Sequence, residues 1–282
     1  MLHRLGAMDR WDLVLWDAVK HPGDFGSNLA ARSALANGAN ASMVCPNGRT
    51  ALWTAVRNSK ADTVKLLLGN GATATDLGNA PALFTLCVNR LDVRSLQYLF
   101  TSGALDTVDE ECFHRAMNKI AHPVCEYGES SVDDALHIMR MCVHYAVIRG
   151  YELSRLINTP DMFFRTRTLL HQAATSACIY LRVPLVQMLV DYDADVFSRD
   201  RDGHTAEDLA RSQPNCTAID DEVIGILKKE RLRTMEVEAF AMGSHPRLGR
   251  TSVVDTLDAD NLRVICELIR KRGRAQAFTP IG

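Results

Sequence analysis

Cysteines and histidines in the middle of the chain are the residues whose types and spacing come closest to a metal site. They form three short pairs, spaced C-x-H, H-x-x-C and C-x-H: Cys112 with His114, His122 with Cys125, and Cys142 with His144. Structural zinc is held by four thiolate or imidazole ligands in short paired spacings. The pairs could supply one such site if the chain between them folds back. The alternative, which we favour, is that the cysteines are small core residues and that no metal is bound.

Nucleophilic catalysis finds less support. A reactive Cys–His pair needs a strained turn or a helix N-terminus that lowers the pKa of the thiol, and no cysteine of this sequence has that context. The sequence contains no phosphate-binding loop of the GxxxxGK(S/T) type and no GxGxxG after a strand. It therefore predicts a protein that is not an enzyme and that uses no cofactor.

The composition of the 282 residues is that of an ordinary globular protein, with 47% hydrophobic and 23% charged residues. The 32 Lys and Arg residues are balanced by 34 Asp and Glu residues, which gives a net charge of −2. A nucleic-acid coat or a polybasic membrane binder would need a positive excess, so both classes are disfavoured. Apolar runs fall short of the about 18 residues that span a bilayer, and the N-terminus lacks a signal peptide's apolar stretch.

The eight cysteines are spread along the chain without a CxxC pair. Disulfide frameworks are dense in cysteine and occur in short secreted chains. We therefore expect reduced thiols and a location in the cytoplasm, with the nucleus as the alternative.

The sequence contains an internal repeat, and this repeat predicts where the helices and turns of the chain lie. Its clearest copy runs NGRTALWTAV from Asn47, continues as VKLLL from Val64 and ends in GNGA at Ala72. This is a turn, a short helix with an apolar face, a second Leu-rich helix and a glycine stop. Thr50 stands where a helix N-cap is needed, and Gly71 stands where the chain needs a positive φ.

The same order of segments recurs along the chain. Further copies begin near Leu15, Pro81, Thr168 and Asp202, and a weaker one begins near Phe113. This pattern resembles the ankyrin repeat, DGxTPLHxAAxxG…VVxLLLxxGAD, with a period of about 33 residues. The histidine of the TPLH box is retained at His114 and His171, and its place is taken elsewhere by Trp16, Trp53 and Phe84, which we expect to fill space between repeats.

The resemblance implies an all-α ankyrin-repeat solenoid, built of helix-turn-helix repeats with β-turn fingers, followed by a C-terminal helical extension. We divide the chain into an N-terminal tail at 1–8, an array at 9–231 and a segment at 232–282. The array has about six units: 9–42, 43–76, 77–108, 109–164, 165–198 and 199–231. Stacked repeats share one continuous core, because a single repeat cannot bury its own apolar face.

For function, the resemblance implies a non-catalytic module that binds a partner protein in a concave groove lined by turns and inner helices. We expect a monomer that binds neither nucleic acid nor membrane. The groove positions carried over from the family are Arg10, Asp12, Asn47, Arg49, Arg57, Asn58, Arg165, Arg167, Asp202 and His204. We expect charge reversal at Arg49 and Arg167 to leave the fold intact, as surface changes usually do.

Beyond the array, the apolar residues from Met235 to Met242 predict that the last helix continues or restarts. An amphipathic helix follows, which opens at Leu257 and has Leu262, Ile265, Cys266 and Ile269 on one face. Its candidate docking residues are Leu257, Leu262, Ile265 and Ile269. This helix either caps the last repeat or resembles the first helix of an F-box. The second interpretation implies a substrate receptor that docks the adaptor of a cullin ubiquitin ligase. A SOCS-like box is a further alternative; both resemblances are incomplete, since Asp258 replaces the usual F-box proline.

Overall fold

The computed structural model describes residues 9–20, 25–46, 48–74, 80–122, 131–161, 166–213 and 218–241. Within these ranges the chain is all-α, with thirteen helices and, in place of a sheet, two isolated antiparallel bridges. One bridge joins Val44 to Thr50, and the other joins Asp161 to Arg167. The predicted fold class is therefore confirmed.

The chain forms two compact units. The first comprises residues 1–120 and 127–156, and the second comprises residues 121–126 and 157–282. The first unit contains α1 (Arg10–Lys20), α2 (Phe25–Ala36), α3 (Ala51–Arg57), α4 (Ala61–Gly69), α5 (Ala80–Arg90), α6 (Val93–Thr101), α7 (Glu110–Ala121, apart from its last residue) and α8 (Val132–Ile148). The short helix α9 (Leu153–Asn158) spans the division between the units.

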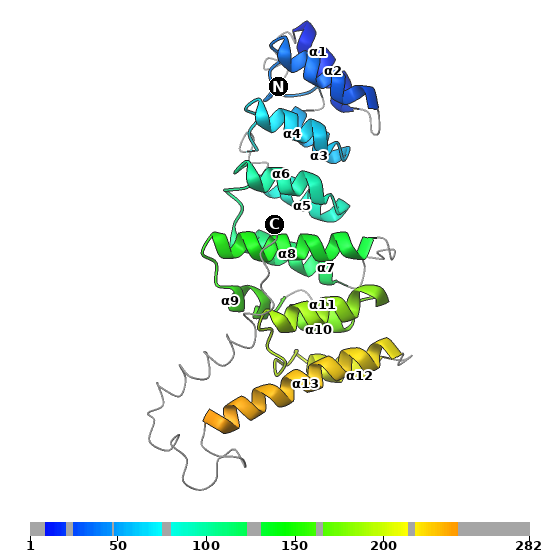
Figure 1. Ribbon diagram of the computed structural model, residues 1–282, viewed down its shortest axis with the longest axis vertical. Coiled ribbons are helices and arrows are strands. Elements are labelled where there is room, and N and C mark those ends of the chain that lie inside the picture. The colour runs from blue at the N-terminus through cyan, green and yellow to red at the C-terminus, as the bar shows by residue number, and fades with distance from the viewer. Residues whose placement is uncertain are drawn as a thin grey trace. The chain divides into compact units, whose positions relative to one another are not determined.

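Helices of the first unit stack in two rows (Figure 1). The inner helices α1, α3 and α5 pack in sequence against one another, and the outer helices α2, α4, α6 and α8 do the same. Each inner helix also packs against the outer helix that follows it, as α3 does against α4. Every repeat thus covers the apolar face of its neighbour, which is the arrangement that stabilises stacked repeats.

A recurring triplet of buried residues sets the register of the inner helices. The triplet is Leu15, Ala18 and Val19 in α1; Leu52, Ala55 and Val56 in α3; Phe84, Cys87 and Val88 in α5; and Phe113, Ala116 and Met117 in α7. The i, i+3, i+4 spacing places its members on one helix face. The rings of Phe84 and Phe113 lie with their centroids 5.1 Å apart, so equivalent triplet residues touch across neighbouring repeats.

This register corrects one part of the sequence alignment. Phe84 occupies the buried place of Leu52, and it is the exposed Thr85 that corresponds to Trp53. The alignment was one residue out because both Leu83 and Phe84 are apolar and both are fully buried. The sequence pattern alone therefore could not show which of them faces the neighbouring inner helices.

The second unit contains α10 (Leu169–Ala174), α11 (Ile179–Asp191), α12 (Ala206–Arg211) and α13 (Ala218–Ala241). The helix α10 packs against α11 and α12, and α13 packs against both α11 and α12. A buried ion pair between Arg182 of α11 and Asp220 of α13 joins two of these helices. The last helix continues past residue 231 without restarting, which decides between the two sequence alternatives for this segment.

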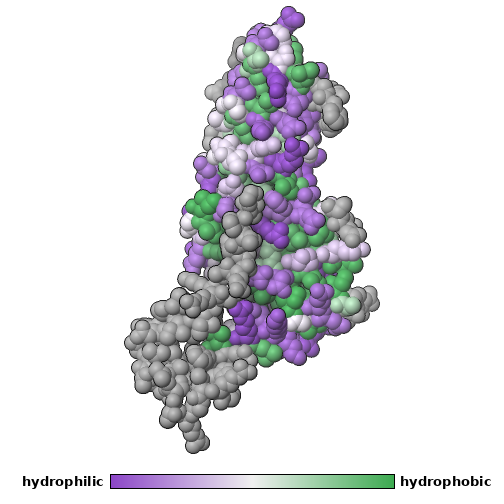
Figure 2. Space-filling model, in the orientation of Figure 1, coloured by the Kyte–Doolittle hydropathy of each residue, from purple (hydrophilic) through white to green (hydrophobic). Residues whose placement is uncertain are grey.

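The described helices include none that is both long and apolar enough to cross a membrane. Exposed apolar side chains do occur singly or in pairs, as is normal for a protein surface. Val147 and Ile148 are 50% and 63% exposed, and Figure 2 shows a hydrophobic patch over the corresponding end of α8.

Candidate protein-interaction site

A tight turn precedes α3 and fixes the backbone at the start of that helix. The backbone N–H of Cys45 donates to the carbonyl of Arg49 over 2.7 Å, and the N–H of Gly48 donates to the carbonyl of Cys45 over 2.8 Å. Gly48 has a φ of 75°, a value that glycine adopts without strain. Thr50 then caps the helix, because its hydroxyl accepts the N–H of Trp53 over 3.1 Å. The predicted N-cap is confirmed.

The capped helix brings Trp53 between two arginines. The guanidinium carbon of Arg49 lies 4.7 Å from the centroid of the indole ring, and that of Arg57 lies 5.5 Å from it. Both distances are within the range of a cation–π contact, which stabilises an exposed pair by about 0.5–1 kcal/mol. Trp53 is half-buried and both arginines are exposed, so the three residues form a surface cluster, which we call the Arg–Trp–Arg cluster.

This cluster belongs to a wider surface on the inner helices. In α1, α3 and α5, the first and last members of the buried triplet are each followed by a residue that retains solvent exposure. We call these positions in α1, α3 and α5 the inner-helix surface: Trp16, Lys20, Trp53, Arg57, Thr85 and Asn89. Because α3 packs against both α1 and α5, the positions on neighbouring helices lie next to one another. The surface contains two aromatic and two cationic side chains and no carboxylate.

Two of the predicted binding residues in this unit have structural partners. The carboxylate of Asp12 accepts the backbone N–H of Asn40 over 2.8 Å, which ties α1 to the loop after α2. The side-chain amide of Asn58 donates to the carbonyl of Val19 over 2.7 Å, which joins the end of α3 to the end of α1. Arg10 is exposed and lies 5.4 Å from the ring centroid of Trp11. Asp12 and Asn58 therefore hold neighbouring elements together.

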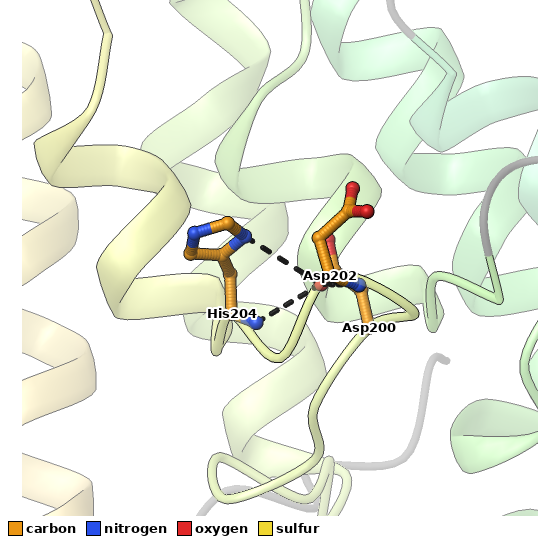
Figure 3. A group of neighbouring side chains, drawn as sticks. All are labelled: Asp200, Asp202 and His204. Carbon is orange, nitrogen blue, oxygen red and sulfur yellow. Dashed lines mark hydrogen bonds and ion pairs between the residues drawn. The ribbon is translucent and has the colours of Figure 1, made fainter.

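In the second unit, a similar turn precedes α12 and is organised by a buried carboxylate (Figure 3). One oxygen of Asp200 accepts the backbone N–H groups of Asp202 and His204, each over 3.0 Å. Its other oxygen lies 3.4 Å from the Nε of Arg167, while the Asp200 side chain is 0% exposed. Burial raises the pKa of Asp200, but the two N–H groups and the Arg167 guanidinium outweigh that effect and hold the pKa below its usual value.

Arg167 is consequently a poor position for the charge reversal suggested by the sequence. A glutamate there would place a second carboxylate beside the buried Asp200, and removing one partner of a buried pair is destabilising. We therefore expect charge reversal at Arg167 to destabilise this turn, contrary to the expectation from the sequence. The contact depends on residues 33 positions apart, which sequence spacing could not reveal.

Asp202 and His204 are exposed at the tip of this turn. Together with Asp200 they form a group whose potential ligand atoms lie within 4.8 Å of one another. The geometry is explained by the turn itself, because Asp200 accepts hydrogen bonds from the backbone of the other two. Of the remaining predicted residues, Asn47 and Arg165 lie outside the described residues, as do the docking positions Leu257, Leu262, Ile265 and Ile269.

Comparison with protein families identifies the repeat around the Arg–Trp–Arg cluster. Residues 47–79 match the family model of the ankyrin repeat. The chain contains an ankyrin repeat at these residues. Ankyrin-repeat domains are in general non-catalytic modules for protein interaction. No significant relative was found among curated proteins.

Solved structures similar to the chain include further ankyrin-repeat proteins. The human ASB11 ankyrin repeat domain has 18% identity and a TM-score of 0.41, covering 77% of this chain and 97% of that one. The ankyrin repeat protein EF0377 has 18% identity and a TM-score of 0.48, covering 77% and 96%. The complex of the Bd0816 predatory endopeptidase from Bdellovibrio bacteriovorus with the immunity protein Bd3460 contains a similar chain, with 19% identity, a TM-score of 0.46 and coverage of 77% and 97%.

The two histidines assigned to the ankyrin TPLH box make different contacts. His171 is fully buried, and its Nδ1 lies 2.8 Å from the hydroxyl and 3.3 Å from the backbone N of Thr168, while its Nε2 lies 3.1 Å from the carbonyl of His204. His114 is half-buried, and both of its ring nitrogens contact the side-chain amide of Asn118. The helix of His114 is capped instead by Asp109, whose carboxylate accepts the N–H of Cys112.

The cysteines of the proposed zinc pairs are buried where the structure describes them. Cys112 lies near Asp109 and Arg115, and Cys142 is fully buried in α8. Burial raises the pKa of the Cys142 thiol to about 12, and burial is also the largest cause of the raised pKa of Cys112. Both thiols are therefore protonated at neutral pH, which fits core residues better than nucleophiles. Cys125 lies outside the described residues.

Proposed function

We propose that this ankyrin-repeat protein is a non-catalytic module that binds a partner protein through the inner-helix surface of its first unit. The observation that carries the proposal is the Arg–Trp–Arg cluster. Trp53 keeps part of its ring exposed on a helix whose other side is fully buried, and two arginines lie over that ring. Tryptophan and arginine are the residue types most enriched among the hot spots of protein interfaces.

The neighbouring positions support the same assignment. Lys20 of α1, which pairs with Asp17 over 2.5 Å, lies on one side of the cluster, while Thr85 and Asn89 of α5 lie on the other. Polar residues around an aromatic anchor form the rim that excludes water from a hot spot. Charged groups at such a surface chiefly steer association and select partners, whereas burial of the indole supplies affinity.

Site-specific photo-crosslinking tests this proposal. A photoreactive amino acid replaces either Asn89 on α5 or Gln97 on α6, two exposed positions of the same repeat that lie on an inner and an outer helix. We expect ultraviolet irradiation of cells producing the protein to yield a discrete crosslinked protein from position 89 and none from position 97. Equal labelling at both positions, or labelling at position 97 alone, would contradict the assignment of the binding face.

Changing the cluster tests the same surface without a crosslinker. Arg57→Glu reverses one exposed charge, and Lys65→Glu on the outer helix α4 is the matched control. We expect the first change to reduce the yield of the product formed at position 89 at least tenfold, and the second to leave that yield within twofold of the parent. An unchanged yield in Arg57→Glu would remove the cluster from the binding site.

A further inference from the structure

We infer that the amphipathic segment at 257–269 packs against an exposed apolar stripe of α13 and covers the outer side of the last predicted unit of the array. The segment lies outside the described residues, and its helix is the one expected from the sequence. The inference concerns the second unit and does not depend on the proposed function. It follows from side-chain exposure on α13, the spacing of apolar residues, their charged neighbours and the length of the intervening chain.

The helix α13 has apolar side chains on two faces. It packs against α11 and α12, and its residues Val223 and Leu227 are buried. In contrast, Leu232 and Met235 are 51% and 52% exposed, and Ile224 is half-buried. Since a helix turns by about 100° per residue, Ile224, Leu232 and Met235 share one side, which we call the α13 stripe. A terminal repeat needs a polar or a covered outer face, so the α13 stripe is the place for a cover.

The segment at 257–269 repeats the spacing found along α13. Residues 228, 232 and 235 are separated by four and then three positions, and so are residues 258, 262 and 265. A spacing of four and three is the seven-residue repeat by which two helices pack side by side. If the two helices run in the same direction, this spacing places like positions opposite each other. The aligned pairs are Lys228 with Asp258, Leu232 with Leu262, and Met235 with Ile265.

Charge selects the parallel direction. Lys228 is exposed, and among the described residues it forms no ion pair with a carboxylate. The parallel alignment brings Asp258 to this lysine, so that opposite charges meet beside the apolar contact. An antiparallel alignment would instead bring Arg270 and Lys271 to it. Like charges at a contact disfavour that arrangement, and charge pairs of this kind fix the register of a packed pair.

The length of the intervening chain fits the parallel direction. The helix α13 ends at Ala241, and residues 242–256 precede the segment. To lie beside residue 227, residue 257 must return by 14 helical residues, which is about 21 Å at 1.5 Å each. Neighbouring helices are about 8–10 Å apart, so the whole span is about 23 Å. A random-coil chain of this length has a root-mean-square end-to-end distance of about 19–23 Å, which matches.

The connection favours this occupant over a separate protein. A segment joined to its site by a short linker is present there at an effective concentration in the millimolar range, and the effect is largest when the linker matches the span. An adaptor protein would have to compete with that concentration. The apolar residues assigned to adaptor docking by the F-box-like alternative would then be covered by the chain itself. They are Leu257, Leu262, Ile265 and Ile269.

Alkylation of Cys266 tests the inference on the full chain. Cys266 lies on the apolar face of the predicted helix, so docking should protect its thiol from N-ethylmaleimide. We expect Cys266 to react at least tenfold faster in the double variant Leu232→Glu, Met235→Glu than in the parent, as measured by mass spectrometry of the tryptic peptide 264–270. Equal rates in the two proteins would overturn the inference and leave this face available to an adaptor.

The matched control is Arg233→Glu. It changes the net charge by the same amount as the double variant, from an exposed position two residues before Met235, which places it on nearly the opposite side of α13. We expect Cys266 in this variant to react within twofold of the parent rate. An increase as large as that in the double variant would show a general charge effect and would contradict docking on the α13 stripe.

Disulfide formation tests the alignment. Met235→Cys with Ile265→Cys joins an aligned pair, Arg233→Cys with Ile265→Cys is the control, and both proteins carry Cys266→Ser. We expect mild oxidation to form the 235–265 disulfide within a single chain at least fivefold faster than the 233–265 disulfide. Equal rates, or disulfides found only between two chains, would contradict the proposed packing.

Charge exchange in the disulfide assay tests the direction. We expect Lys228→Glu to slow formation of the 235–265 disulfide at least threefold, because Asp258 then meets a second carboxylate. Adding Asp258→Lys should restore the rate to within twofold of the starting protein. A rate that is unchanged or faster in Lys228→Glu would overturn the parallel alignment.

Discussion

Replacing Asp200 is the sharpest test of how the turn before α12 is stabilised. In Asp200→Ala, the backbone N–H groups of Asp202 and His204 lose their shared acceptor, and Arg167 loses the carboxylate beside it. An unsatisfied buried donor costs about 1–3 kcal/mol, and both N–H groups are partly buried, so the low end applies to each. With the loss of the charged partner, we expect the free energy of unfolding to fall by about 2–4 kcal/mol.

Asp200→Asn separates the hydrogen bonds from the charge. The amide oxygen can still accept both backbone N–H groups, but the residue no longer carries the negative charge that faces Arg167. We therefore expect a smaller loss, of about 1–2 kcal/mol, in urea unfolding followed by far-UV circular dichroism at pH 7. If Asp200→Ala unfolds within about 0.5 kcal/mol of the parent, the carboxylate does not hold the turn and the reasoning is wrong.

The pH dependence of the same difference gives an independent check. Because the pKa of Asp200 is lower in the folded protein than in the unfolded chain, its contribution is fully present above the ordinary carboxyl pKa of about 3.9. The contribution is lost as the pH falls through the lower, folded value. The gap between the parent and Asp200→Asn should therefore shrink in acid, and a gap that stays constant from pH 7 to pH 3 would contradict the assignment.

Three further predictions concern other parts of the chain. Leu67 is fully buried in α4, so Leu67→Ala should lower the free energy of unfolding by about 2–5 kcal/mol through cavity formation; a parent-like urea midpoint would contradict that burial. Burial lowers the pKa of His171, so the folded state should lose stability as the pH falls below about 6.5, by up to about 1.4 kcal/mol per pH unit, while His171→Gln should show a flatter dependence. Treatment with a strong chelator should leave the melting temperature unchanged, whereas a drop that added zinc reverses would establish a metal site among the cysteines and histidines.

Much of the repeat could be predicted from sequence because its signals are local. Thr50 caps α3 as expected, since an N-cap depends on a hydroxyl and on the N–H three residues ahead. Gly71 has the positive φ that ends the Leu-rich helix, with a value of 84°. The family match at 47–79 lies on the copy with the most complete pattern. The division of the whole array into six units stays a prediction.

The roles of the candidate binding residues depended on contacts that no local pattern encodes. The sequence predicted that Asp12, Asn58 and Arg167 are groove residues. In the structure, Asp12 contacts a residue 28 positions away, Asn58 one that is 39 positions away, and Arg167 one that is 33 positions away. The sequence predicted that Trp53 fills space between repeats, because an aromatic residue in an apolar helix usually packs inward. The sequence signal for its contacts with two guanidinium groups is the pair of arginines four residues before and four residues after it.

The amino-acid sequence by itself determined the period of the repeat, the caps and stops of its helices, and the apolar residues available for the core. These features depend on side chains within a few residues of one another, where backbone geometry leaves little freedom. The tertiary structure decided which of two adjacent apolar residues, Leu83 or Phe84, takes the place of Leu52, and which polar side chains join neighbouring elements. The physical reason is that these choices depend on packing between helices far apart in the chain, and that packing leaves Trp53 and its two arginines at the surface.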